Sequence, residues 1–329
     1  MTRQYLVTGG AGFVGSHLVA ALVRQGAECT VLDNLSMGHR QAVPDGVRLV
    51  VGEVDDTALL DDTLAGRHWD GAFHFAALSL VGDSMRRPYE YLRRNVDAGL
   101  SLIEACVKHK VGGLVVSSTA ALFAVAGDGL IDETTPIDPG SPYGESKWML
   151  ERALLWAGRI HGLRSSALRY FNAAGADPEG ALGEDHRPET HLIPLVIDAA
   201  LGRRDALTVF GDDYATPDGT CIRDYVHVCD LASAHIGVLE HLTTDCRAYN
   251  LGTGTGNSVM DVVRSVERVS GHVVPLRIEA RRPGDPAILV ASSKRIAREV
   301  NWRPRFVTLD DIVATAFAWR ERHPNGYAA

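Results

Sequence analysis

The sequence predicts an α/β fold: a doubly wound parallel sheet joined to a smaller, mixed α/β C-terminal lobe. Three observations predict it. Short apolar runs alternate with helical patterns over the first 170 residues, a glycine-rich loop follows the first run, and the alternation ends after about Arg169. Alternation of strand and helix favours parallel strands joined by right-handed crossovers.

The first half contains apolar runs that are short and uniform enough to be strands covered on both faces. They are Tyr5–Val7, Cys29–Leu32, Leu49–Val51, Gly71–Phe75, Leu114–Val116 and Ser166–Leu168. Helical patterns lie between them at Val14–Gln25, Tyr89–His109 and Pro142–His161. We therefore expect residues 1–170 to form one domain.

The second half has longer loops rich in Gly, Pro and Asp, at residues 175–188 and 211–220. Shorter helices are predicted at Leu192–Leu201, Asp230–His241, Ser258–Ser270 and Leu309–Glu321. Neither a repeat nor a flexible linker separates the halves. We expect residues 171–329 to form a lobe laid against the first domain, with some crossing of the chain between them.

Composition narrows the function classes. The 329 residues carry a net charge of −8 and no basic tract longer than a doublet, so we expect no nucleic-acid partner. Apolar runs fall short of the roughly 18 residues of a membrane span, and the N-terminus does not resemble a signal peptide. The five cysteines are scattered without a CxxC pair, which favours a reduced, cytoplasmic protein.

A glycine loop follows the first predicted strand and opens a helix. The segment Thr8–Gly15 contains Gly9, Gly10, Gly12 and Gly15. Glycines permit the tight turn, let the backbone approach a pyrophosphate, and allow close packing of helix and strand. The helix N-terminus then presents N–H groups to the phosphates. The loop is typical of a Rossmann-type dinucleotide site.

Asp33 ends the second predicted strand, 18 residues after Gly15. The dinucleotide fingerprint places an acid at about this distance to accept hydrogen bonds from ribose hydroxyls. Because a carboxylate would repel a 2′-phosphate, the predicted cofactor is NAD and not NADP. The alternative, a tight turn with a surface aspartate, is disfavoured by the register of strand, loop, helix and acid.

A hydroxyl, a phenol and an amine are placed for acid–base chemistry. Thr119 follows the strand at Leu114–Val116, at the edge where parallel sheets bind ligands. Tyr143 and Lys147 are four residues apart and share one helix face. An ammonium near a phenol lowers the phenol pKa, so the phenolate becomes available as a general base. A Tyr-x-x-x-Lys pair alone is usually a surface accident, but here it follows the glycine loop and the acid.

With these motifs together, the chain resembles the extended short-chain dehydrogenase/reductase superfamily, whose catalytic set is Ser/Thr, Tyr and Lys. Further runs resemble the UDP-glucose 4-epimerase family from Leu6 to about Tyr327. They are His74–Ala77, Asn95–Asp97, Leu168–Asn172, Arg223–Val228, Tyr249–Gly252 and Arg281–Asp285. The resemblance implies NAD-dependent, reversible inversion at C4 of a UDP-hexose through a 4-keto sugar, of the UDP-glucose/UDP-galactose type.

The resemblance also implies site residues. Thr119, Tyr143 and Lys147 would be catalytic. The cofactor would contact Gly9, Gly12, Phe13, Val14, Gly15, Asp33, Asn34, Glu53, Val54, Phe75, Ala76, Asn95, Tyr143, Lys147 and Tyr170. The UDP-sugar would contact Thr119, Tyr143, Asn172, Leu192, Arg223, Arg282 and Asp285. Residues 1–170 would thus bind NAD and residues 171–329 the UDP-sugar. Without the resemblance, Arg223 and Arg282 would be assigned to salt bridges with Asp224 or Asp285.

Departures from the family pattern leave the identity of the sugar substrate undetermined. Phe123-Ala124 stands where the family usually has Tyr-Gly, and Leu289 stands where the room for the 2-substituent is set. A family lysine near the pyrophosphate is replaced by Ser79, which leaves the tightness of NAD binding open. The alternatives are an epimerase of another UDP-sugar (N-acetylhexosamine, pentose or uronate), a dehydratase or decarboxylase, and a non-catalytic NAD-binding protein. Ala120 and Ala121 disfavour the dehydratase and decarboxylase, which place an acid there.

Two expectations concern partners and metals. Family members commonly form homodimers through two long helices, which correspond here to Tyr89–His109 and Pro142–His161. We expect the same assembly. The family-like segments contain His17, His74 and His227, but no metal-ligand spacing joins them, so we assign these histidines a structural role and predict no metal.

Overall fold

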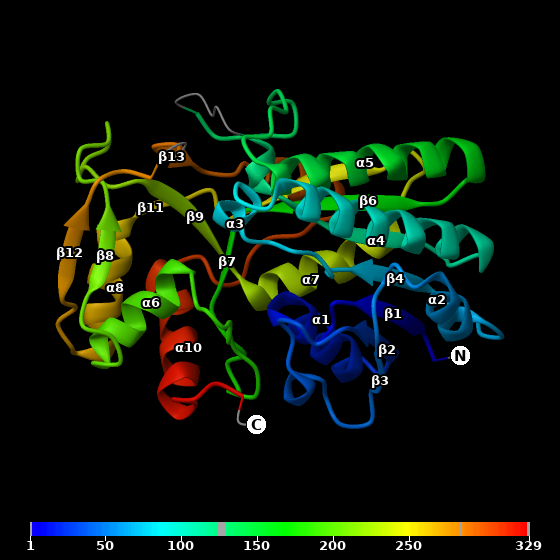
Figure 1. Ribbon diagram of the computed structural model, residues 1–329, viewed down its shortest axis with the longest axis horizontal. Helices are drawn as coiled ribbons and strands as arrows, with labels where there is room; N and C mark the ends of the chain where they lie inside the picture. Colours follow the sequence, from blue (N-terminus) through cyan, green and yellow to red (C-terminus); the bar gives the residue numbers. More distant parts are fainter. Residues whose placement is uncertain (1, 124–128, 283–284, 328–329) are drawn as a thin grey trace.

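The computed structural model describes residues 2–123, 129–282 and 285–327. Figure 1 shows a large sheet between two layers of helices and, beside it, a smaller part built around β8, β12, α6, α8 and α10. The predicted fold class is confirmed, because the large sheet is wholly parallel and the smaller part mixes short strands with helices.

The large sheet has seven strands in the order β10-β6-β5-β4-β1-β2-β3. Their bounds are β1 (Gln4–Thr8), β2 (Glu28–Asp33), β3 (Arg48–Val51), β4 (Gly71–His74), β5 (Leu114–Thr119), β6 (Ser165–Tyr170) and β10 (Arg247–Leu251). The strand order reverses between β1 and β4. Ligands of open α/β sheets bind in the crevice at such a switch point, past the carboxyl ends of the strands.

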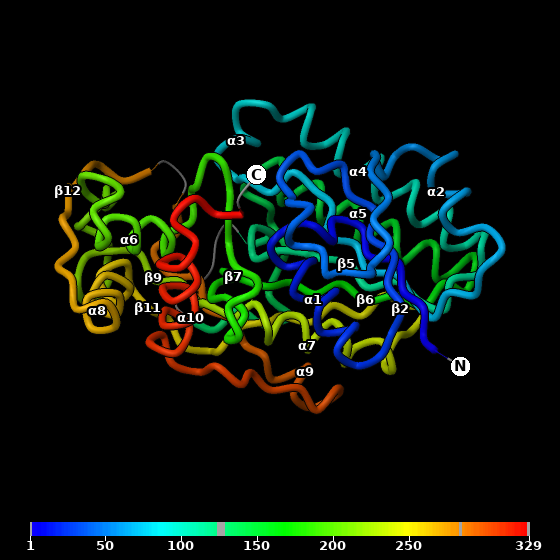
Figure 2. The backbone as a smooth tube through the Cα atoms, turned by 90° about the horizontal axis from the view of Figure 1, so that it is seen from below, coloured from blue at the N-terminus to red at the C-terminus, as the bar shows by residue number. Residues whose placement is uncertain are grey.

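Alternate residues of the central strands enter two separate cores. Tyr5 and Val7 face the layer of α1 and α7, whereas Leu6 faces the layer of α2, α4 and α5. Figure 2, turned by 90°, shows the smaller part lying beside this sandwich, so the two parts form an elongated molecule. The sheet is therefore covered on both faces, as its uniform apolar strands predict.

The edge strand β3 is an exception to that prediction. Leu49 and Val50 are only partly buried, and Val51 is 50% exposed. The prediction that Leu49–Val51 is covered on both faces is wrong, because β3 lies at the end of the sheet and pairs only with β2. Its apolar character reflects strand propensity more than burial.

The second half of the chain contributes to both parts. Its short strands are β7 (Asn172–Ala174), β8 (Leu207–Phe210), β9 (Ile222–His227), β11 (Gly256–Ser258), β12 (Leu276–Glu279) and β13 (Ile288–Leu289). β9 pairs with β7, β11 and β13, while β8 pairs with β12. In contrast, β10 joins the large sheet beside β6, and α7 packs on α1. The chain thus crosses between the two parts.

The predicted long helices are present with ends shifted by a residue or two. The α-helices are α1 (Phe13–Arg24), α2 (Thr57–Leu64), α3 (Val81–Ser84), α4 (Pro88–Lys108), α5 (Pro142–His161), α6 (Leu192–Ala200), α7 (Val228–Val238), α8 (Val259–Ser270), α9 (Lys294–Glu299) and α10 (Leu309–Arg322). The helix predicted at Asp230–His241 is divided into α7 and a 3₁₀ turn at Leu239–His241. Sequence periodicity did not find α2, α3 and α9, whose short lengths give few repeats. Across the described part of the chain, no helix combines the length and the apolar character that crossing a bilayer requires.

Candidate active site

The glycine loop connects β1 to α1 at the switch point of the sheet. Gly9 has a φ of 72°, and a Cβ there would lie 2.4 Å from the Ala76 nitrogen. A Cβ on Gly15 would lie 2.2 Å from the Gly9 oxygen. Gly12 is the N-cap of α1 and offers no side-chain cap to the amides that follow, at Phe13 and Val14. The loop therefore leaves helix amides open to a phosphate, which fits a dinucleotide.

The predicted ribose acid sits beneath this loop. Asp33 is 6% exposed, and its carboxylate accepts hydrogen bonds from the Ala11 amide at 3.0 Å and the Leu35 amide at 2.8 Å. Burial raises its pKa. Nearby, Asn34 Nδ2 donates to Glu53 at 3.0 Å, and Val54 is buried in the adjoining core. The predicted adenosine residues are thus brought together at the ends of β2 and β3.

The residues after β4 complete the opposite side of the crevice. The Phe75 ring lies at 45° to the His235 ring, with centroids 4.7 Å apart, and the Ala76 amide donates to Thr8 O. Asn95 of α4 is 3% exposed, and its side-chain amide is fully used. Its oxygen accepts from the Leu78 amide at 2.8 Å, and its nitrogen donates to Leu78 O and to Ser146 Oγ, both at 3.0 Å. Asn95 therefore fixes the loop after β4 against α5.

Tyr143 and Lys147 lie in the first turns of α5. Ser141 caps this helix by accepting from the Gly144 amide at 3.2 Å, and Pro142 begins it. The helix starts beside η2 (Ala120–Leu122), where a Cβ on Gly144 would lie 2.3 Å from the Ala121 oxygen. This close approach, which only glycine allows, brings the Tyr143 side chain to the end of β5.

A hydroxyl–lysine network joins five side chains from β5, α5 and β6: Ser117, Thr119, Tyr143, Lys147 and Tyr170. Lys147 Nζ donates to Ser117 Oγ at 3.0 Å, and the Ser117 hydroxyl also interacts with the Tyr170 hydroxyl. Thr119 Oγ1 accepts from the Ala121 amide at 3.1 Å and interacts with the Tyr143 hydroxyl. The sequence motifs had singled out Thr119, Tyr143 and Lys147, whereas Ser117 is now seen to orient the lysine.

Burial shifts the pKa values of Tyr143 and Lys147 in this network. Burial raises the pKa of Tyr143 to about 12, although the Thr119 hydrogen bond opposes that rise. Burial also lowers the pKa of Lys147 to about 8. A lowering of the Tyr143 pKa by Lys147 stays a prediction. The ammonium lies 6.0 Å from the phenol ring centroid and donates to Ser117 instead.

A buried ion pair supports the network from below. The Glu151 carboxylate of α5 accepts from Arg169 Nε at 2.9 Å and Nη2 at 2.5 Å, and from Ser118 Oγ at 2.6 Å. The Glu151 and Arg169 side chains are 6% and 5% exposed. The pair ties α5 to β5 and β6 behind Lys147. Motif spacing did not reveal it, since the two residues are 18 positions apart.

The histidines of the family-like segments are buried and hydrogen-bonded within the protein. His17 Nδ1 lies 2.7 Å from Phe13 O, His74 Nδ1 lies 2.7 Å from Thr8 Oγ1, and His227 Nε2 lies 3.0 Å from Thr315 Oγ1. Burial lowers the pKa of His17 to about 4 and of His74 and His227 to about 3. All three are therefore neutral at pH 7 and serve as hydrogen-bonding core residues.

The residues predicted to hold the UDP-sugar lie on the other side of the crevice. Asn172 of β7 donates to Asp224 O at 3.0 Å, and Leu192 begins α6. Arg223 Nη2 pairs with Asp285 Oδ1 at 2.8 Å, which is one of the salt bridges that the sequence predicts without the family resemblance. Arg282 pairs with neither acid and lies over the Phe210 ring at 4.0 Å. The two guanidinium groups thus have different partners, a carboxylate for Arg223 and an aromatic ring for Arg282.

Asp224, which the sequence analysis considered only as a salt-bridge partner, organises this region. It is fully buried and accepts from the amides of Thr253, Gly254 and Ala291 at 2.9, 3.0 and 3.1 Å, and from the Thr253 hydroxyl at 2.8 Å. Burial raises its pKa. Asp224 thereby joins β9 to the turn after β10 and to β13, and so fixes the neighbouring Arg223.

Phe123 and Leu289, the positions that leave the sugar substrate undetermined, lie in one hydrophobic cluster. Phe123 and Leu289 both contact the small core of Leu122 and Ile131, with Phe123 2% exposed. The Arg169 guanidinium lies 5.8 Å from the Phe123 ring. Ala124 lies outside the described residues. Ser79 is exposed in the loop between β4 and α3.

Comparisons with known proteins agree with this geometry. The family model "NAD dependent epimerase/dehydratase family" matches residues 5–252. The UDP-glucose 4-epimerase of Halalkalibacterium halodurans is 46% identical over 325 residues, which cover 98% of this chain and 97% of the relative.

Two solved structures extend the likeness to the whole fold. The Brucella ovis UDP-glucose 4-epimerase in complex with NAD has a TM-score of 0.92 and 44% identity, covering 96% of this chain and 98% of its own. The Bifidobacterium longum enzyme in complex with NAD+ and UDP has a TM-score of 0.93 and 36% identity, covering 98% and 100%. From the glycine loop, the hydroxyl–lysine network and these matches together, we conclude that the chain belongs to the NAD-dependent epimerase/dehydratase family.

Proposed function

We propose that the protein is an NAD-dependent UDP-glucose 4-epimerase that interconverts UDP-glucose and UDP-galactose. The observation that carries the proposal is the buried hydroxyl–lysine network at the switch point, with a glycine cradle on one side and Arg223 on the other. The relatives from Halalkalibacterium halodurans, Brucella ovis and Bifidobacterium longum bear this name over nearly the full chain.

The cofactor would contact the residues that line the glycine loop and the strand ends. Gly9, Gly12 and Phe13 would hold the pyrophosphate, and Asp33 the adenosine ribose, through the acceptor capacity that two amide bonds leave on its carboxylate. The chemistry that bound NAD supplies is reversible hydride acceptance at C4 of the sugar, with a positive charge that favours the Tyr143 phenolate. Phe75 and Ala76 would border the nicotinamide end.

The chain's own groups handle the proton. Tyr143 accepts the 4-hydroxyl proton and returns it after the sugar has inverted. Thr119 holds the same oxygen through its hydroxyl, already directed at Tyr143. Lys147, turned toward Ser117 here, stabilises the phenolate charge once the phenol ionises. Arg223 and Arg282 hold the diphosphate, so the 4-keto sugar can present its other face without leaving.

Purified protein should interconvert UDP-galactose and UDP-glucose with NAD present. A panel with UDP-N-acetylhexosamines, UDP-pentoses and UDP-uronates then ranks the sugars around Phe123 and Leu289. Absence of interconversion for the glucose/galactose pair, with turnover of another UDP-sugar, would move the proposal to that sugar. Absence of turnover for every sugar, with NAD bound, would support a non-catalytic role.

We further propose that residues 1–170 bind NAD and residues 171–329 the UDP-sugar, with α7 and β10 crossing into the first part, and that the enzyme acts in the cytoplasm. The five cysteines support a reducing compartment, because each is a free thiol.

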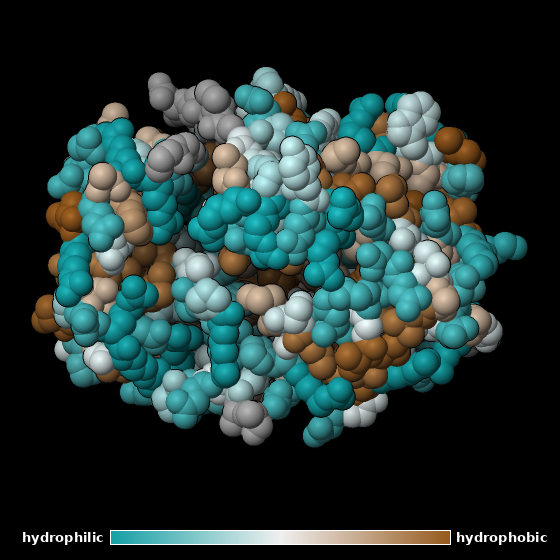
Figure 3. Space-filling view, viewed as in Figure 1, coloured by the Kyte–Doolittle hydropathy of each residue, from teal (hydrophilic) through white to brown (hydrophobic). Residues whose placement is uncertain are grey.

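A homodimer through α4 and α5 is also proposed. These helices pack on each other, yet leave large apolar side chains exposed: Leu100 40%, Met149 45%, Trp156 52% and Ile160 66%. Figure 3 shows apolar side chains gathered over these two helices. The spacing of Met149, Trp156 and Ile160 places them along one face of α5, so a second copy could cover them as a stripe.

Replacing Trp156 and Ile160 together by glutamate should turn the dimer into a monomer in analytical ultracentrifugation. Val273→Glu, at an 82% exposed position in the smaller part, is the matched control and should leave the mass unchanged. A wild-type protein that sediments as a monomer at micromolar concentration would contradict the dimer.

A further inference from the structure

A cluster of two glutamates and two histidines lies outside the proposed active site. Glu184, His186, Glu189 and His191 belong to the segment that joins β7 to α6. Each offers one oxygen or nitrogen atom, and these four atoms all lie within 4.8 Å of one another. The prediction of no metal rested on His17, His74 and His227 and did not consider this group.

The distances between these atoms suit a single small cation. The Nδ1 atom of His191 is 2.6 Å from Glu184 Oε1 and 3.4 Å from Glu189 Oε1. The Nδ1 atom of His186 is 3.2 Å from Glu184 Oε1 and 3.8 Å from Glu189 Oε2. Ligands at about 2.0–2.1 Å from a tetrahedral ion lie roughly 3.3 Å apart, which falls within the 2.6 to 3.8 Å range of the contacts among Glu184 Oε1, Glu189 Oε2 and the two imidazoles.

Against the effect of burial, the Glu184 and Glu189 carboxylates pair with both imidazoles and raise the pKa of His186 to about 9 and of His191 to about 10, yet three of these atoms lack a well-aligned hydrogen bond. Glu184 Oε1, His186 Nδ1 and Glu189 Oε2 are buried atoms without a hydrogen-bond partner. The Glu184 and Glu189 side chains are only 7% and 8% exposed. Buried polar atoms are almost always paired, and leaving them unpaired is costly. Three such atoms directed at one point indicate a missing partner that accepts lone pairs.

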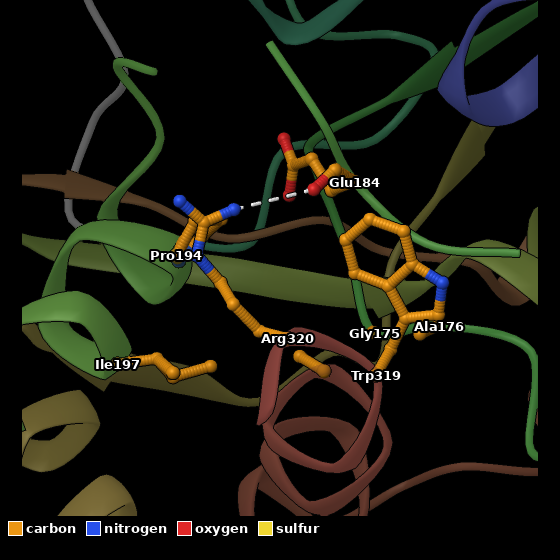
Figure 4. Close-up of a pocket in the computed structure, with 8 residues that line it drawn as sticks. Gly175, Ala176, Glu184, Pro194, Ile197, Trp319 and Arg320 are labelled. Carbon is orange, nitrogen blue, oxygen red and sulfur yellow. Dashed lines mark hydrogen bonds between the residues drawn. The ribbon is translucent and has the colours of Figure 1, made fainter. Parts of the chain in front are cut away.

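The surroundings hold the cluster rigidly. Figure 4 shows Glu184 beside Trp319 and Arg320 of α10, and Arg320 Nη1 donates to the Glu184 main-chain oxygen at 3.4 Å. An adjoining cavity, which Glu184 alone of the four residues lines, measures about 10 Å³, at the lower limit for one water molecule and far below a nucleotide. The other oxygen of Glu189 accepts from the Thr190 and His191 amides at 2.8 and 2.9 Å. The ligand atoms are therefore placed by the fold before any ion arrives.

We propose that Glu184, His186, Glu189 and His191 form a structural zinc site. Two imidazoles disfavour Mg²⁺ and Ca²⁺, which prefer all-oxygen shells, and favour Zn²⁺ or a neighbouring transition metal. Two carboxylates neutralise the charge of a divalent ion. Four protein ligands fill a tetrahedral shell, so the site is closed, as structural zinc sites are.

The position of the site suggests what the ion would stabilise. The His186 ring meets the Phe13 ring edge-on at 6.4 Å, and Phe13 begins α1 at the glycine loop. His191 is the N-cap of α6, directly before Leu192. Zinc would thus fasten the segment that lies between the proposed NAD site and the proposed UDP-sugar site. Its loss should loosen both sites without touching the hydroxyl–lysine network.

The first test measures metal in the holoprotein. Tag-free protein, purified without chelator and then incubated with ZnSO₄ and desalted, should carry close to one zinc per chain by mass spectrometry. Cobalt substitution should give the intense visible bands of tetrahedral Co²⁺. Chelation with dipicolinate should lower Tm, and zinc at about 100 times its Kd should restore it by roughly 5 °C.

Variants locate the metal. His191→Gln is the primary variant, because this side chain is 48% exposed and its replacement should spare folding. His186→Gln and Glu184→Gln are the second and third. Each should abolish zinc retention and the cobalt spectrum. The matched control is His109→Gln, which removes an imidazole 2.8 Å from Asp61 where no second histidine lies nearby.

The alternative is a cluster of His–Glu ion pairs that needs no metal. It predicts zinc well below one per chain in wild type, equal to that in the His191→Gln variant, and no effect of zinc on Tm. That result would overturn the proposal. Because metal content and the cobalt spectrum do not depend on turnover, the outcome is independent of whether the protein epimerises UDP-sugars.

Discussion

The hydroxyl–lysine network and the arginine group of Arg223, Arg282 and Asp285 differ in burial and in their bonding partners. In the network, Ser117, Thr119 and Lys147 are at most 9% exposed, and each bonds to another member of the network or to the backbone beside it. In the arginine group, Asp285 is 31% exposed, and its partner Arg223 is 13% exposed.

The difference follows from what each region must do. Proton transfer needs groups fixed within tenths of an ångström, which burial and the Glu151–Arg169 pair provide. Holding a diphosphate needs long cationic side chains that exchange one anion for another. In the proposed enzyme, a phosphate would replace the Asp285 carboxylate as the partner of Arg223. Four substitutions test this contrast, in decreasing order of expected effect.

Tyr143→Phe should have the largest effect, because it removes the only phenol that the network directs at Thr119. We expect kcat to fall about 10²–10⁴-fold, the range for loss of a general base, with little change in KM. Steady-state kinetics with UDP-galactose would measure it. Tyr249→Phe, which loses a 3.2 Å bond to Glu299 elsewhere on the same sheet, should keep full activity. Equal effects in both variants would contradict the assigned role.

Glu151→Gln should destabilise the protein most. It leaves the buried Arg169 guanidinium without its counter-charge, which typically costs about 3–5 kcal/mol. Urea unfolding followed by circular dichroism would measure the change. Asp61→Asn breaks the surface pairs with Lys108 and His109 and should cost at most about 1 kcal/mol. If Glu151→Gln lowers the free energy of unfolding only slightly, water reaches the pair. The pair would then stabilise the network less than its burial suggests.

Arg223→Ala should act on binding and spare chemistry. Losing a charge-assisted bond to phosphate costs about 1.5–3 kcal/mol, so KM for the UDP-sugar should rise roughly 10–100-fold while kcat changes little. Arg223→Lys should recover only part of this loss, because lysine cannot form the planar fork. A large drop in kcat at saturating substrate would place Arg223 in the transition state and erase the contrast between the two regions.

The smallest expected effect is on the pH dependence of the free energy of unfolding. Burial holds the pKa of His74 at about 3 in the folded protein, whereas an unfolded histidine titrates near pH 6.5. Between these values the unfolded chain binds more protons, so the free energy of unfolding must fall as the pH drops below about 6.5. His74 alone contributes a slope of up to about 1.4 kcal/mol per pH unit.

His74→Gln should flatten this slope, because glutamine keeps a partner for Thr8 without binding a proton. Urea unfolding at pH 7, 6 and 5 would measure it, and His68→Gln, at an 81% exposed side chain, serves as control. An unchanged slope in His74→Gln would show that acid enters through other buried groups, such as His17, His227 and His235.

Much of the molecule could be predicted from local pattern. The glycine loop, Asp33, Thr119 and the Tyr143–Lys147 pair all lie where the parallel sheet places ligands, because strand ends and helix starts are set by short-range sequence. Burial of β3 was mispredicted because an apolar run does not say whether its strand lies at the centre or the edge of a sheet. Short helices such as α9 gave too few turns for a periodic signal.

Through its motifs, then, the sequence alone determined the fold class and the cofactor type, and it predicted the chemistry-bearing residues. Only the tertiary structure decided which charges meet. It paired Glu151 with Arg169, turned Lys147 toward Ser117, joined Arg223 to Asp285, and gathered the four residues of the proposed zinc site. The physical reason is that pKa values and ion pairs depend on burial and on distances of a few ångströms between residues remote in sequence. Those quantities exist only after the chain has folded.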